Sequence, residues 1–548
     1  MSVFNINISI DGKPMAETAI ITRLDVIREA NKIGYAQLII KDGDPAIRKF
    51  EMSEMDDFMP GKKIEIKLGY TGDPDSESTV FKGLIVKNGI EADIHGGFLE
   101  VTIKHPAIKM TGKRKKAVFS DLTDTDLFQL LIKNNGIETG TIAATETQHP
   151  ELVQFWCTDW DMLLSRADLY GFWVMTKNGS VDILDPANLD RETVHHHYEY
   201  GKDPIISLKF EANAEEQYGK IVSSGWNIQD QVLTEGDDAV DFNPNPGDLN
   251  PEYMAEVTGG KDLELNSTVP VALSELNSWA NGKMRKSRLG MIRGRLCIPG
   301  NALIKPGEIV ELKGLNSHFN GKAIISGIRH RMTTGGWFTD IQFGMDPQSF
   351  VSRHQVMDQP ASGIIPGIQG LHLGIVEEFE ADPLEELRVK VKIPALGEEH
   401  NQVWARLVCP EAGTGRGYFF RPEPGDEVVL GFLNSDPRHP IILGSLYSSV
   451  LNPPEQIGII NEDNFIKGIY TRTGMKISFD DENQIIELST SDNQHVTVNE
   501  KEKFIHIKGA NDNSMLLNNN GITLTSTGDL NIEASGKIII KGSGVDIQ

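Results

Sequence analysis

The chain has 548 residues, and its 78 Asp and Glu outnumber its 53 Lys and Arg to give a formal net charge of −25. This excess of acid argues against nucleic acid as the main partner, because contacts to phosphates need clustered basic side chains. The amino terminus lacks the apolar run of a signal peptide, and no stretch approaches the roughly 18 apolar residues of a membrane span, so we expect a protein that folds in the cytoplasm.

Residues 1–108 are predicted to form a first β-barrel. Four segments alternate apolar and polar residues or are rich in β-branched residues, and Gly, Asp and Pro mark the turns between them. These segments are residues 35–40 (YAQLII), 62–70 (KKIEIKLGY), 81–86 (FKGLIV) and 98–104 (FLEVTIK). At about 100–200 residues per domain, the chain length predicts roughly three to five domains, of which this is the first.

Residues 109–198 are predicted to form an α/β insert with two helices. The first, within residues 123–136, has Thr and Asp at its start, an apolar stripe and a closing Gly136. The second, residues 159–171, ends at Gly171, which suits a C-terminal cap. Four of its side chains are spaced i, i+3, i+4 and i+7 and therefore share one face: Trp160, Leu163, Leu164 and Ala167.

Two charged clusters lie at the start of this insert. Asp121, Asp124 and Asp126 could indicate calcium, but the glycine and the terminal glutamate of an EF-hand are missing, so we interpret them as helix-capping residues. The basic run from Lys113 to Lys116 is interpreted as a solvated loop.

Residues 199–353 return to strands and are predicted to form a second β-barrel. One helix interrupts them at about residues 271–289, with an inward face made of Leu276, Trp279, Ala280 and Met284. Two β-rich blocks that flank a helical insert suggest a duplicated barrel, although the sequence shows no clear repeat.

The second half of the chain begins with a linker at residues 354–370, which is rich in Pro, Gly and Ser. Residues 371–449 form a compact strand-rich module whose size fits an OB-fold barrel. A second linker is expected at residues 450–470, before a repetitive tail at residues 471–548. The whole pattern predicts a mainly β, multidomain protein.

The tail is predicted to be a needle. From residue 522 onward, pairs of apolar residues recur every eight residues, with glycines between the pairs. Such short strands bury two side chains per step and leave open edges, which one chain cannot protect. Three copies wound about one axis would bury the pairs and close the edges. The prediction is a homotrimeric, intertwined β-helix (β-prism) with six residues on its axis: Ile522, Leu524, Leu530, Ile532, Ile538 and Ile540.

Several long segments resemble VgrG-type spike proteins of contractile injection systems, which correspond to the fused hub and needle of contractile phage tails. The most specific are residues 403–447 in the OB-like module and residues 471–490 (TRTGMKISFDDENQIIELST), which resemble the segment that opens the needle. In the hub, residues 28–45, 58–70 and 80–91 resemble its first barrel, and residues 158–174 resemble its helical insert.

The resemblance implies a homotrimeric spike at the tip of a sheath-driven tube, which punctures a target envelope and carries effectors. Two hub barrels per chain would match a hexameric, Hcp-like tube protein, and baseplate proteins would hold the assembly. A conical PAAR-type tip protein would dock on the last residues: Val545, Asp546, Ile547 and Gln548. Assembly is expected in the cytoplasm, followed by delivery outside the cell or into target cells. A type VI secretion system, an extracellular injection particle and a phage remain open as the source.

The sequence does not predict an enzyme. It contains no H-E-x-x-H, G-x-S-x-G, Walker A or dinucleotide motif, and we expect no cofactor. Relatives with an enzymatic extension or a lysozyme domain differ from this chain, for which neither is expected. Asp480 and Asp481 fit a hairpin turn better than a glycosidase pair. Three cysteines, which lie far apart, predict neither a disulfide framework nor a zinc site: Cys157, Cys297 and Cys409.

Histidines offer two metal candidates. His195 and His197 would share a strand face with Glu199, but we interpret residues 195–200 (HHHYEY) as a polar edge or loop. His495 and His506 lie in the needle, where the alternation places Ile505 and Ile507 inward and His506 outward. An axial metal ion in the needle stays open.

The alternative function is a trimeric phage-type tailspike or adhesin that binds or cleaves surface polysaccharide. A tailspike would need a long solenoid with an acid-lined groove, and an adhesin would predict an aromatic-rich tip. The predicted needle is short, and no aromatic residue follows Phe504. Both features favour the puncturing spike.

Overall fold

The structure is a computed structural model that describes residues 3–46, 48–94, 96–259, 261–457 and 463–547. The chain divides into two compact units, residues 1–358 and 359–548. Strands make up 42% of the structure and helices 14%, so the mainly β fold expected from the sequence is confirmed. None of the described helices is both long and apolar enough to cross a membrane.

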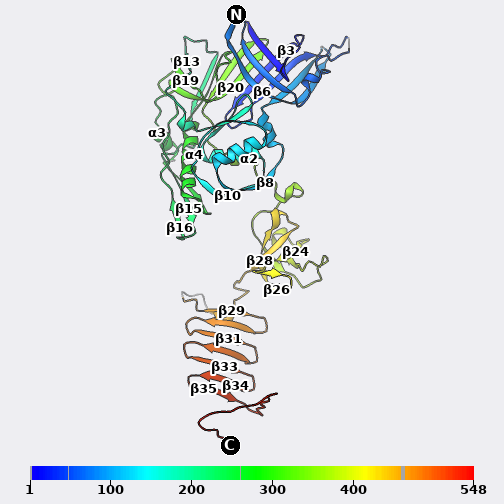
Figure 1. Cartoon of the computed structure of the whole chain (residues 1–548), viewed down its shortest axis with the longest axis vertical. Helices are drawn as coiled ribbons and strands as arrows, with labels where there is room; N and C mark the ends of the chain where they lie inside the picture. Colours follow the sequence, from blue (N-terminus) through cyan, green and yellow to red (C-terminus); the bar gives the residue numbers. More distant parts are fainter. Residues whose placement is uncertain (1–2, 47, 95, 260, 458–462, 548) are drawn as a thin grey trace. The chain divides into compact units, whose positions relative to one another are not determined.

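The first unit is built on a 13-stranded sheet (Figure 1). All the strands expected between residues 35 and 104 are present in it. Along the sheet the order is β14 (Ser207–Ala212), β18 (Ile292–Pro299), β21 (Gly336–Phe343), β20 (Gly321–Thr333), β3 (Ile21–Glu29), β4 (Tyr35–Asp42), β7 (Gly96–Lys104), β6 (Asp73–Asp93), β5 (Lys63–Tyr70), β1 (Phe4–Ile10) and β2 (Lys13–Pro14). A branch from β20 adds β19 (Ile309–Lys313) and β13 (His196–Glu199).

The two β-rich blocks of this unit are hydrogen-bonded to each other. Strand β3 comes from the first block and β20 from the second, and they pair in antiparallel register from Gly327 opposite Glu29 to Met332 opposite Leu24. The alternation along these strands places one set of side chains in a core, where Leu24, Val26 and Leu38 are fully buried. Each such side chain contributes roughly 1.5–3 kcal/mol to folding before entropy is counted.

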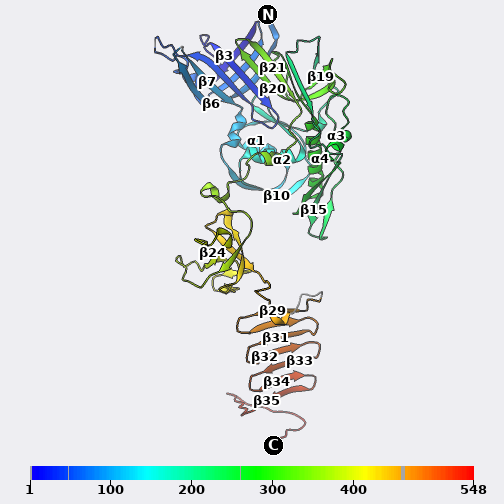
Figure 2. The same cartoon turned by 180° about the vertical axis from the view of Figure 1, so that it is seen from behind.

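The helical insert lies below the large sheet (Figure 2). Helix α1 (Asp124–Asn134) begins at a capping box formed by Thr123 and Asp126, and α2 (Asp159–Tyr170) begins at a second one. Gly171 ends α2 with a φ of 68°, as its sequence position predicted. The smaller strands of this region are β8 (Lys115–Thr123), β9 (Glu138–Ile142), β10 (Gln148–Cys157), β11 (Trp173–Thr176) and β12 (Ser180–Leu184).

Helix α4 (Leu273–Met291) packs directly on α2, which confirms the helix expected near residues 271–289. A Cβ atom at Gly282 would lie 1.9 Å from the carbonyl oxygen of Leu169, so only glycine allows the two helices to approach this closely. The same region adds α3 (Pro251–Val257), α5 (Phe350–Arg353) and a small sheet of β15 (Lys220–Asn227), β16 (Val232–Glu235) and β17 (Asp262–Ser267).

The basic run at residues 113–116 is only partly the solvated loop that we expected, because Lys113 and Lys116 are exposed but Arg114 and Lys115 make specific contacts. Lys115 begins β8, which pairs with β10, and its ammonium forms an ion pair with the buried carboxylate of Asp159. Arg114 donates hydrogen bonds to the carbonyl oxygens of Trp156 (2.7 Å) and Val356 (2.8 Å). The run therefore fastens the β8–β10 ribbon to the neighbouring helix and chain.

The acidic cluster divides into two roles. Asp126 caps α1, as expected, because its carboxylate accepts a hydrogen bond from the backbone N–H of Thr123. The capping interpretation is wrong for Asp124, which is fully buried and accepts hydrogen bonds from Arg166 and Tyr170. Burial favours a raised pKa for Asp124, but the hydrogen bonds from Arg166, Tyr170 and His149 outweigh it and lower the pKa.

The second unit begins with the expected OB-type barrel. Five strands close it, in the order β22 (His372–Val376), β23 (Val389–Lys392), β24 (Gln402–Leu407), β28 (Pro440–Ser445) and β27 (Glu427–Phe432). Its core is aliphatic and includes Val391, Ala405 and Leu430, each fully buried. A short hairpin of β25 (Ala412–Gly413) and β26 (Arg416–Gly417) lies between β24 and β27 in the chain.

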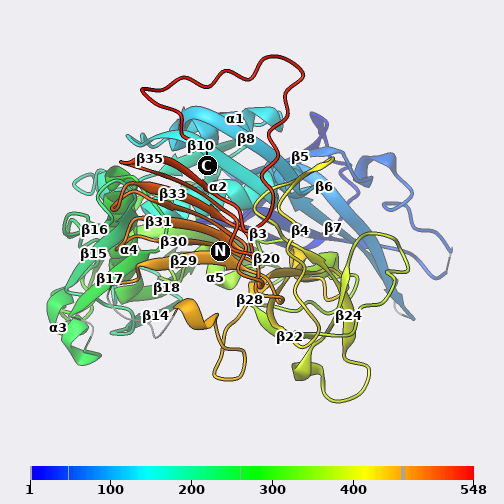
Figure 3. The same cartoon turned by 90° about the horizontal axis from the view of Figure 1, so that it is seen from below.

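A seven-stranded antiparallel meander follows, with each strand paired to the next in sequence order (Figures 1 and 3). Its first strand lies within residues 450–470, where we expected only a linker. The strands are β29 (Ile466–Tyr470), β30 (Lys476–Asp480), β31 (Ile485–Ser489), β32 (His495–Asn499), β33 (Phe504–Lys508), β34 (Ser514–Asn518) and β35 (Gly521–Thr525).

The turns of the meander repeat every 19 residues. At one end, Gly474, Asn493 and Asp512 all have φ between 60° and 82°, in the left-handed region. At the other end, Asp480, Asn499 and Asn518 each accept a hydrogen bond from a backbone N–H two or three residues later. Each pair of strands is therefore one unit of a hairpin repeat.

After β35 the single chain has no helix or strand up to residue 547, and the tail is an irregular trace (Figure 3). The strands expected around residues 530–532, 538–540 and 545–547 are therefore absent from one isolated chain. The physical reason is that these steps hold two apolar residues each and find no neighbouring strand in their own chain. The predicted docking residue Gln548 lies outside the described residues.

Candidate functional site

The meander carries an apolar face. Residues directly opposite each other in an antiparallel pair point to the same side of a sheet, and the observed register stacks apolar pairs such as Ile477 opposite Leu488 and Val498 opposite Ile505. The side chains that share this face, called the apolar face below, are Ile469, Ile477, Phe479, Ile486, Leu488, Val496, Val498, Ile505, Ile507, Met515, Leu517, Ile522 and Leu524.

Nothing in the described part of the chain covers the apolar face. Ile505 is 39% exposed and Ile522 is 67% exposed, and none of the hydrophobic core clusters of the described residues includes a residue of the meander. A single-layer sheet has no second layer against which to bury one face. A continuous exposed apolar surface of this kind is typical of an interaction site.

The opposite face of the meander is polar. Across β30 to β33 the register aligns Ser478, Glu487, Thr497 and His506 on this side. Lys476 forms an ion pair with Glu487 at 3.0 Å, and His495 packs edge-on against His506 with 5.6 Å between ring centroids. The expected alternation at β33 is therefore present: His506 lies opposite to the apolar face that holds Ile505 and Ile507.

The structure brings together only part of the predicted needle axis. Ile522 and Leu524 lie on β35, on the apolar face. The remaining predicted residues lie in the segment without strands, where their side chains are exposed: Leu530, Ile532, Ile538 and Ile540. In the predicted tip, Val545 and Ile547 are also exposed, and Asp546 lies between them. Which contacts these residues make in an assembly stays a prediction.

Sequence reasoning identified part of the apolar face, because it placed Ile505 and Ile507 inward, but it did not identify the period of the meander. It recognised the eight-residue spacing after residue 522 but not the 19-residue spacing before it. The signal was available, because Ile466, Ile485 and Phe504 begin three strands at that spacing. Asp480, Asn499 and Asn518 end the strand that follows each of them. The loops between strands interrupt the simple alternation and hide this longer period.

The histidines at residues 195–197 each have their own partner. His195 accepts a hydrogen bond at Nδ1 from the backbone N–H of Ile309 (3.2 Å). His196 pairs with Glu308 and His197 with Glu311, each at 2.9 Å. In the described ranges no group of three or more His, Cys, Asp or Glu side chains is arranged to hold a metal ion.

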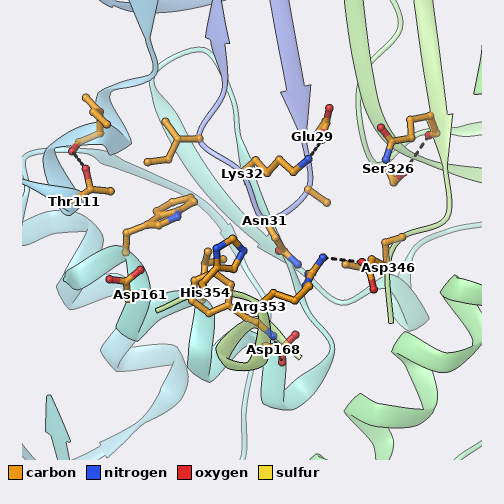
Figure 4. Close-up of a pocket in the computed structure, with 18 of the residues that line it drawn as sticks. Glu29, Asn31, Lys32, Thr111, Asp161, Asp168, Ser326, Asp346, Arg353 and His354 are labelled. Atoms are coloured by element: carbon orange, nitrogen blue, oxygen red, sulfur yellow. Dashed lines mark hydrogen bonds and ion pairs between the residues drawn. The ribbon is translucent and has the colours of Figure 1, made fainter. Parts of the chain in front are cut away.

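A cavity of about 520 Å³ lies beside α2 in the first unit (Figure 4). Its charged side chains largely neutralise one another: Lys32 forms an ion pair with Glu29, and Arg353 with Asp346 at 3.0 Å. Asp168 accepts hydrogen bonds from Lys286 (2.7 Å) and from the hydroxyl of Ser349 (3.1 Å). Asp168 thereby holds the start of α5 against α2, which is a structural role.

The insert and most of the large sheet match one protein family. The family model described as "Alg8 N-terminal domain" matches residues 1–334, which is more than half of the chain. The chain belongs to this family. A second model, described as "Type VI secretion system/phage-baseplate injector OB domain", matches residues 372–447, and these residues span the closed five-stranded barrel.

Curated relatives match a shorter stretch. The actin cross-linking toxin VgrG1 of Vibrio cholerae serotype O1 is 34% identical over 102 residues, and the type VI secretion system spike protein VgrG3 of the same serotype is 33% identical over 102 residues. Each match covers 18% of this chain but only 9% of the relative's length. Among solved structures, the 43 kDa tail protein of prophage MuSo2 from Shewanella oneidensis is 12% identical, with a TM-score of 0.46, over 63% of this chain and 98% of that protein.

The injector OB-domain match and the stretches shared with VgrG1 and VgrG3 support the resemblance of this chain to VgrG-type spike proteins of secretion or injection systems. The toxin name belongs to a protein of which this match covers only a small part.

Proposed function

We propose that the chain works as a homotrimeric spike at the tip of a contractile tube, where it pierces a target envelope and carries a tip protein and effectors. The observation that carries this proposal is the uncovered apolar face of the meander. One chain leaves this face in water, while three chains can bury it by turning their three sheets toward a common axis.

A triangular arrangement fits the geometry of the meander. Each strand from β30 to β35 supplies two apolar residues to one face, so three such sheets fill a narrow core at every level of the stack. Burial of each side chain contributes roughly 1.5–3 kcal/mol before entropy. The polar faces then turn toward water, which suits a rigid rod.

The tail continues the same axis in this proposal. Beyond β35 its steps are too short to pair within one chain, so strands would form there only between chains. Ile522 and Leu524 of β35 would then be followed along the axis by the other four predicted residues: Leu530, Ile532, Ile538 and Ile540. The end of the rod, at residues 545–548, would then hold a conical PAAR-type tip protein. The first unit, with the proposed barrels at 1–108 and 199–353 around the insert at 109–198, would face a hexameric Hcp-like tube and the baseplate proteins.

The native mass of the full-length chain, measured by light scattering after size exclusion, tests the trimer. We expect a mass near three times 60.6 kDa. Ile505→Asp combined with Ile507→Asp places charge on the apolar face and should give monomers, because a buried unpaired carboxylate is strongly unfavourable. The matched control is Thr497→Asp combined with Thr523→Asp, on the polar face, which should remain trimeric. A wild-type chain that stays monomeric at its highest soluble concentration, or an apolar-face variant that stays trimeric, contradicts the proposal.

A further inference from the structure

A second cavity of the first unit, of about 450 Å³, has an unusual lining. It lies between β3, β6, the turn from β11 to β12, the loop from β18 to β19, and β20. Its polar lining consists of cations, hydroxyls, an amide and an imidazole, without a carboxylate: Arg28, Ser78, Thr79, Thr176, Lys177, Asn178, Ser180, Lys305 and His330. The cavity beside α2, by contrast, includes Glu29, Asp161, Asp168 and Asp346. In a chain with a net charge of −25, an acid-free cavity with three cations requires an explanation.

Arg28 is the most deeply buried of these cations, with 7% of its surface exposed. Its Nη1 donates a hydrogen bond to the carbonyl oxygen of Val80 (3.1 Å), but its Nε has no hydrogen-bond partner. Among the described residues it forms no ion pair. Burial lowers the pKa of Arg28 to about 10, which still leaves the guanidinium charged at neutral pH. A buried cation without a counter-charge is costly to the folded state.

His330 presents a second unsatisfied group to the same cavity. It is fully buried, its Nδ1 is 3.0 Å from the hydroxyl of Thr339, and its Nε2 has no partner. Burial and the nearby charge of Arg28 lower its pKa to about 3, so the ring is neutral. In the neutral tautomer in which Nδ1 accepts from the Thr339 hydroxyl, the proton lies on Nε2, where it can donate.

Two acids that act on the lining of this cavity already have partners within the chain. Glu308, the carboxylate whose charge acts on Arg28, accepts hydrogen bonds from His196 (2.9 Å) and from the backbone N–H of Lys305 (2.8 Å). Lys177 forms an ion pair with Asp182. The ammonium of Lys305 makes no ion pair within the part of the chain that the structure describes, and its residue is exposed at the cavity.

We propose that this cavity binds a small oxyanion, either a carboxylate or a phosphate. Arg28 is the buried charged anchor, the Nε2–H of His330 is a second donor, and Lys305 adds attraction at the mouth. Hydrogen bonds between charged groups are the strongest that an anion can find in a protein. The bound anion provides the negative charge that Arg28 lacks among its described neighbours. Because the anion binds only the folded state, binding stabilises the first unit by mass action.

Equilibrium dialysis of the full-length chain tests the site, with labelled inorganic phosphate and labelled succinate as separate probes at constant ionic strength. We expect saturable binding of at least one probe, with one site per chain. The probe that binds more tightly identifies the source of the oxyanion as phosphate or carboxylate. Failure of both probes to saturate at millimolar concentration overturns the proposal.

Variants locate the binding. Arg28→Gln should weaken it by about tenfold or more, because a hydrogen bond from a charged donor is lost. Lys305→Met, an exposed substitution without risk to the core, should weaken it several-fold. The matched control is Lys322→Met, which removes a lysine outside the cavity that pairs with Glu192, and it should bind as the wild type does. If Arg28→Gln does not fold, the comparison of Lys305→Met with Lys322→Met decides alone. Equal affinity in these two variants overturns the proposal.

Discussion

Arg166 holds the buried carboxylate of Asp124 with two hydrogen bonds, 2.6 Å from Nε to Oδ1 and 2.7 Å from Nη2 to Oδ2. Asp124 opens α1 and Arg166 lies on α2, so this pair ties the two helices of the insert together. Tyr170 and His149 complete the set of donors around the carboxylate, at 2.6 Å and 2.8 Å. The Asp124–Arg166 pair therefore joins α1 to α2 through a buried carboxylate that accepts hydrogen bonds from three side chains.

Asp124→Asn should destabilise the first unit by about 3 kcal/mol, at the lower end of the range for a broken buried ion pair, because Glu275 still contacts Arg166 at 2.8 Å. Urea denaturation followed by tryptophan fluorescence measures the change. The matched control is Asp126→Asn, two residues away, which keeps a side chain able to cap α1 and should change stability little. Equal effects of the two substitutions would show that Asp124 contributes no more than a cap.

The stability of the first unit should fall as the pH drops below 6.5. The folded-state pKa of His330 is about 3, while the unfolded chain takes up a proton near the ordinary value of 6.5. Between these values the unfolded state binds more protons, so acid favours unfolding by about 1.4 kcal/mol per pH unit for this one group. Burial and the charge of Arg28 both oppose protonation of the ring, and together they outweigh Asp340, which favours it.

The comparison of wild type with His330→Asn isolates this contribution. Denaturation midpoints measured between pH 6.5 and 4.5 should show a shallower pH dependence in the variant, even though its stability at pH 7 is lower. His400→Asn, a substitution at an exposed histidine, should retain the wild-type slope. A variant slope identical to that of wild type would contradict the assignment.

The tail should gain strands only in the trimer. In hydrogen–deuterium exchange of the full-length protein, amides of residues 526–547 should be protected in the wild type and should exchange freely when Ile538→Asp and Ile540→Asp are combined. The control, Asn531→Asp combined with Lys541→Asp, changes charge at the alternating polar positions and should keep the protection. Free exchange in the wild-type trimer would remove these residues from the axis.

Gly282→Ala should destabilise the contact between α4 and α2. Alanine favours a helix by up to about 1 kcal/mol over glycine, but here the added Cβ would meet the carbonyl of Leu169 at 1.9 Å. We expect a net loss of about 1–3 kcal/mol, typical of an overpacked core, measured as a lowered denaturation midpoint. Gly89→Ala on β6, where a Cβ has no neighbour within 4 Å, is the control and should change little.

Local patterns in the sequence predicted local structure well. The strand alternation between residues 35 and 104, the capped helices α1 and α2 and the OB-type barrel all follow from spacing and turn residues. The pairing of β3 with β20 could not be predicted from such local patterns. Asp25 on β3 and Arg329 on β20 lie 2.6 Å apart but are separated by 304 positions in the chain. Periodicity identifies a strand but does not identify its neighbour.

Two errors at charged residues have a common physical cause. Asp124 and Lys115 stand in polar stretches that are typical of caps and loops, and both are in fact parts of buried or half-buried ion pairs. In both cases the ion-pair partner lies on helix α2, so the sequence around Asp124 or Lys115 does not reveal it. The same limit applies to Arg28, whose isolation becomes visible only when the cavity around it is assembled.

The 19-residue repeat of the meander makes its length adjustable in fixed steps. A duplicated or deleted repeat adds or removes two strands, or about 9.5 Å of stack at the usual spacing between strands. Two antiparallel strands return the chain to the side of the sheet from which it started. The apolar residues of later repeats therefore stay on the apolar face. Adding or removing a single strand would instead leave the chain at the opposite side of the sheet. Spikes of this design should therefore differ in length by whole hairpins, and their reach into a target should change in the same steps.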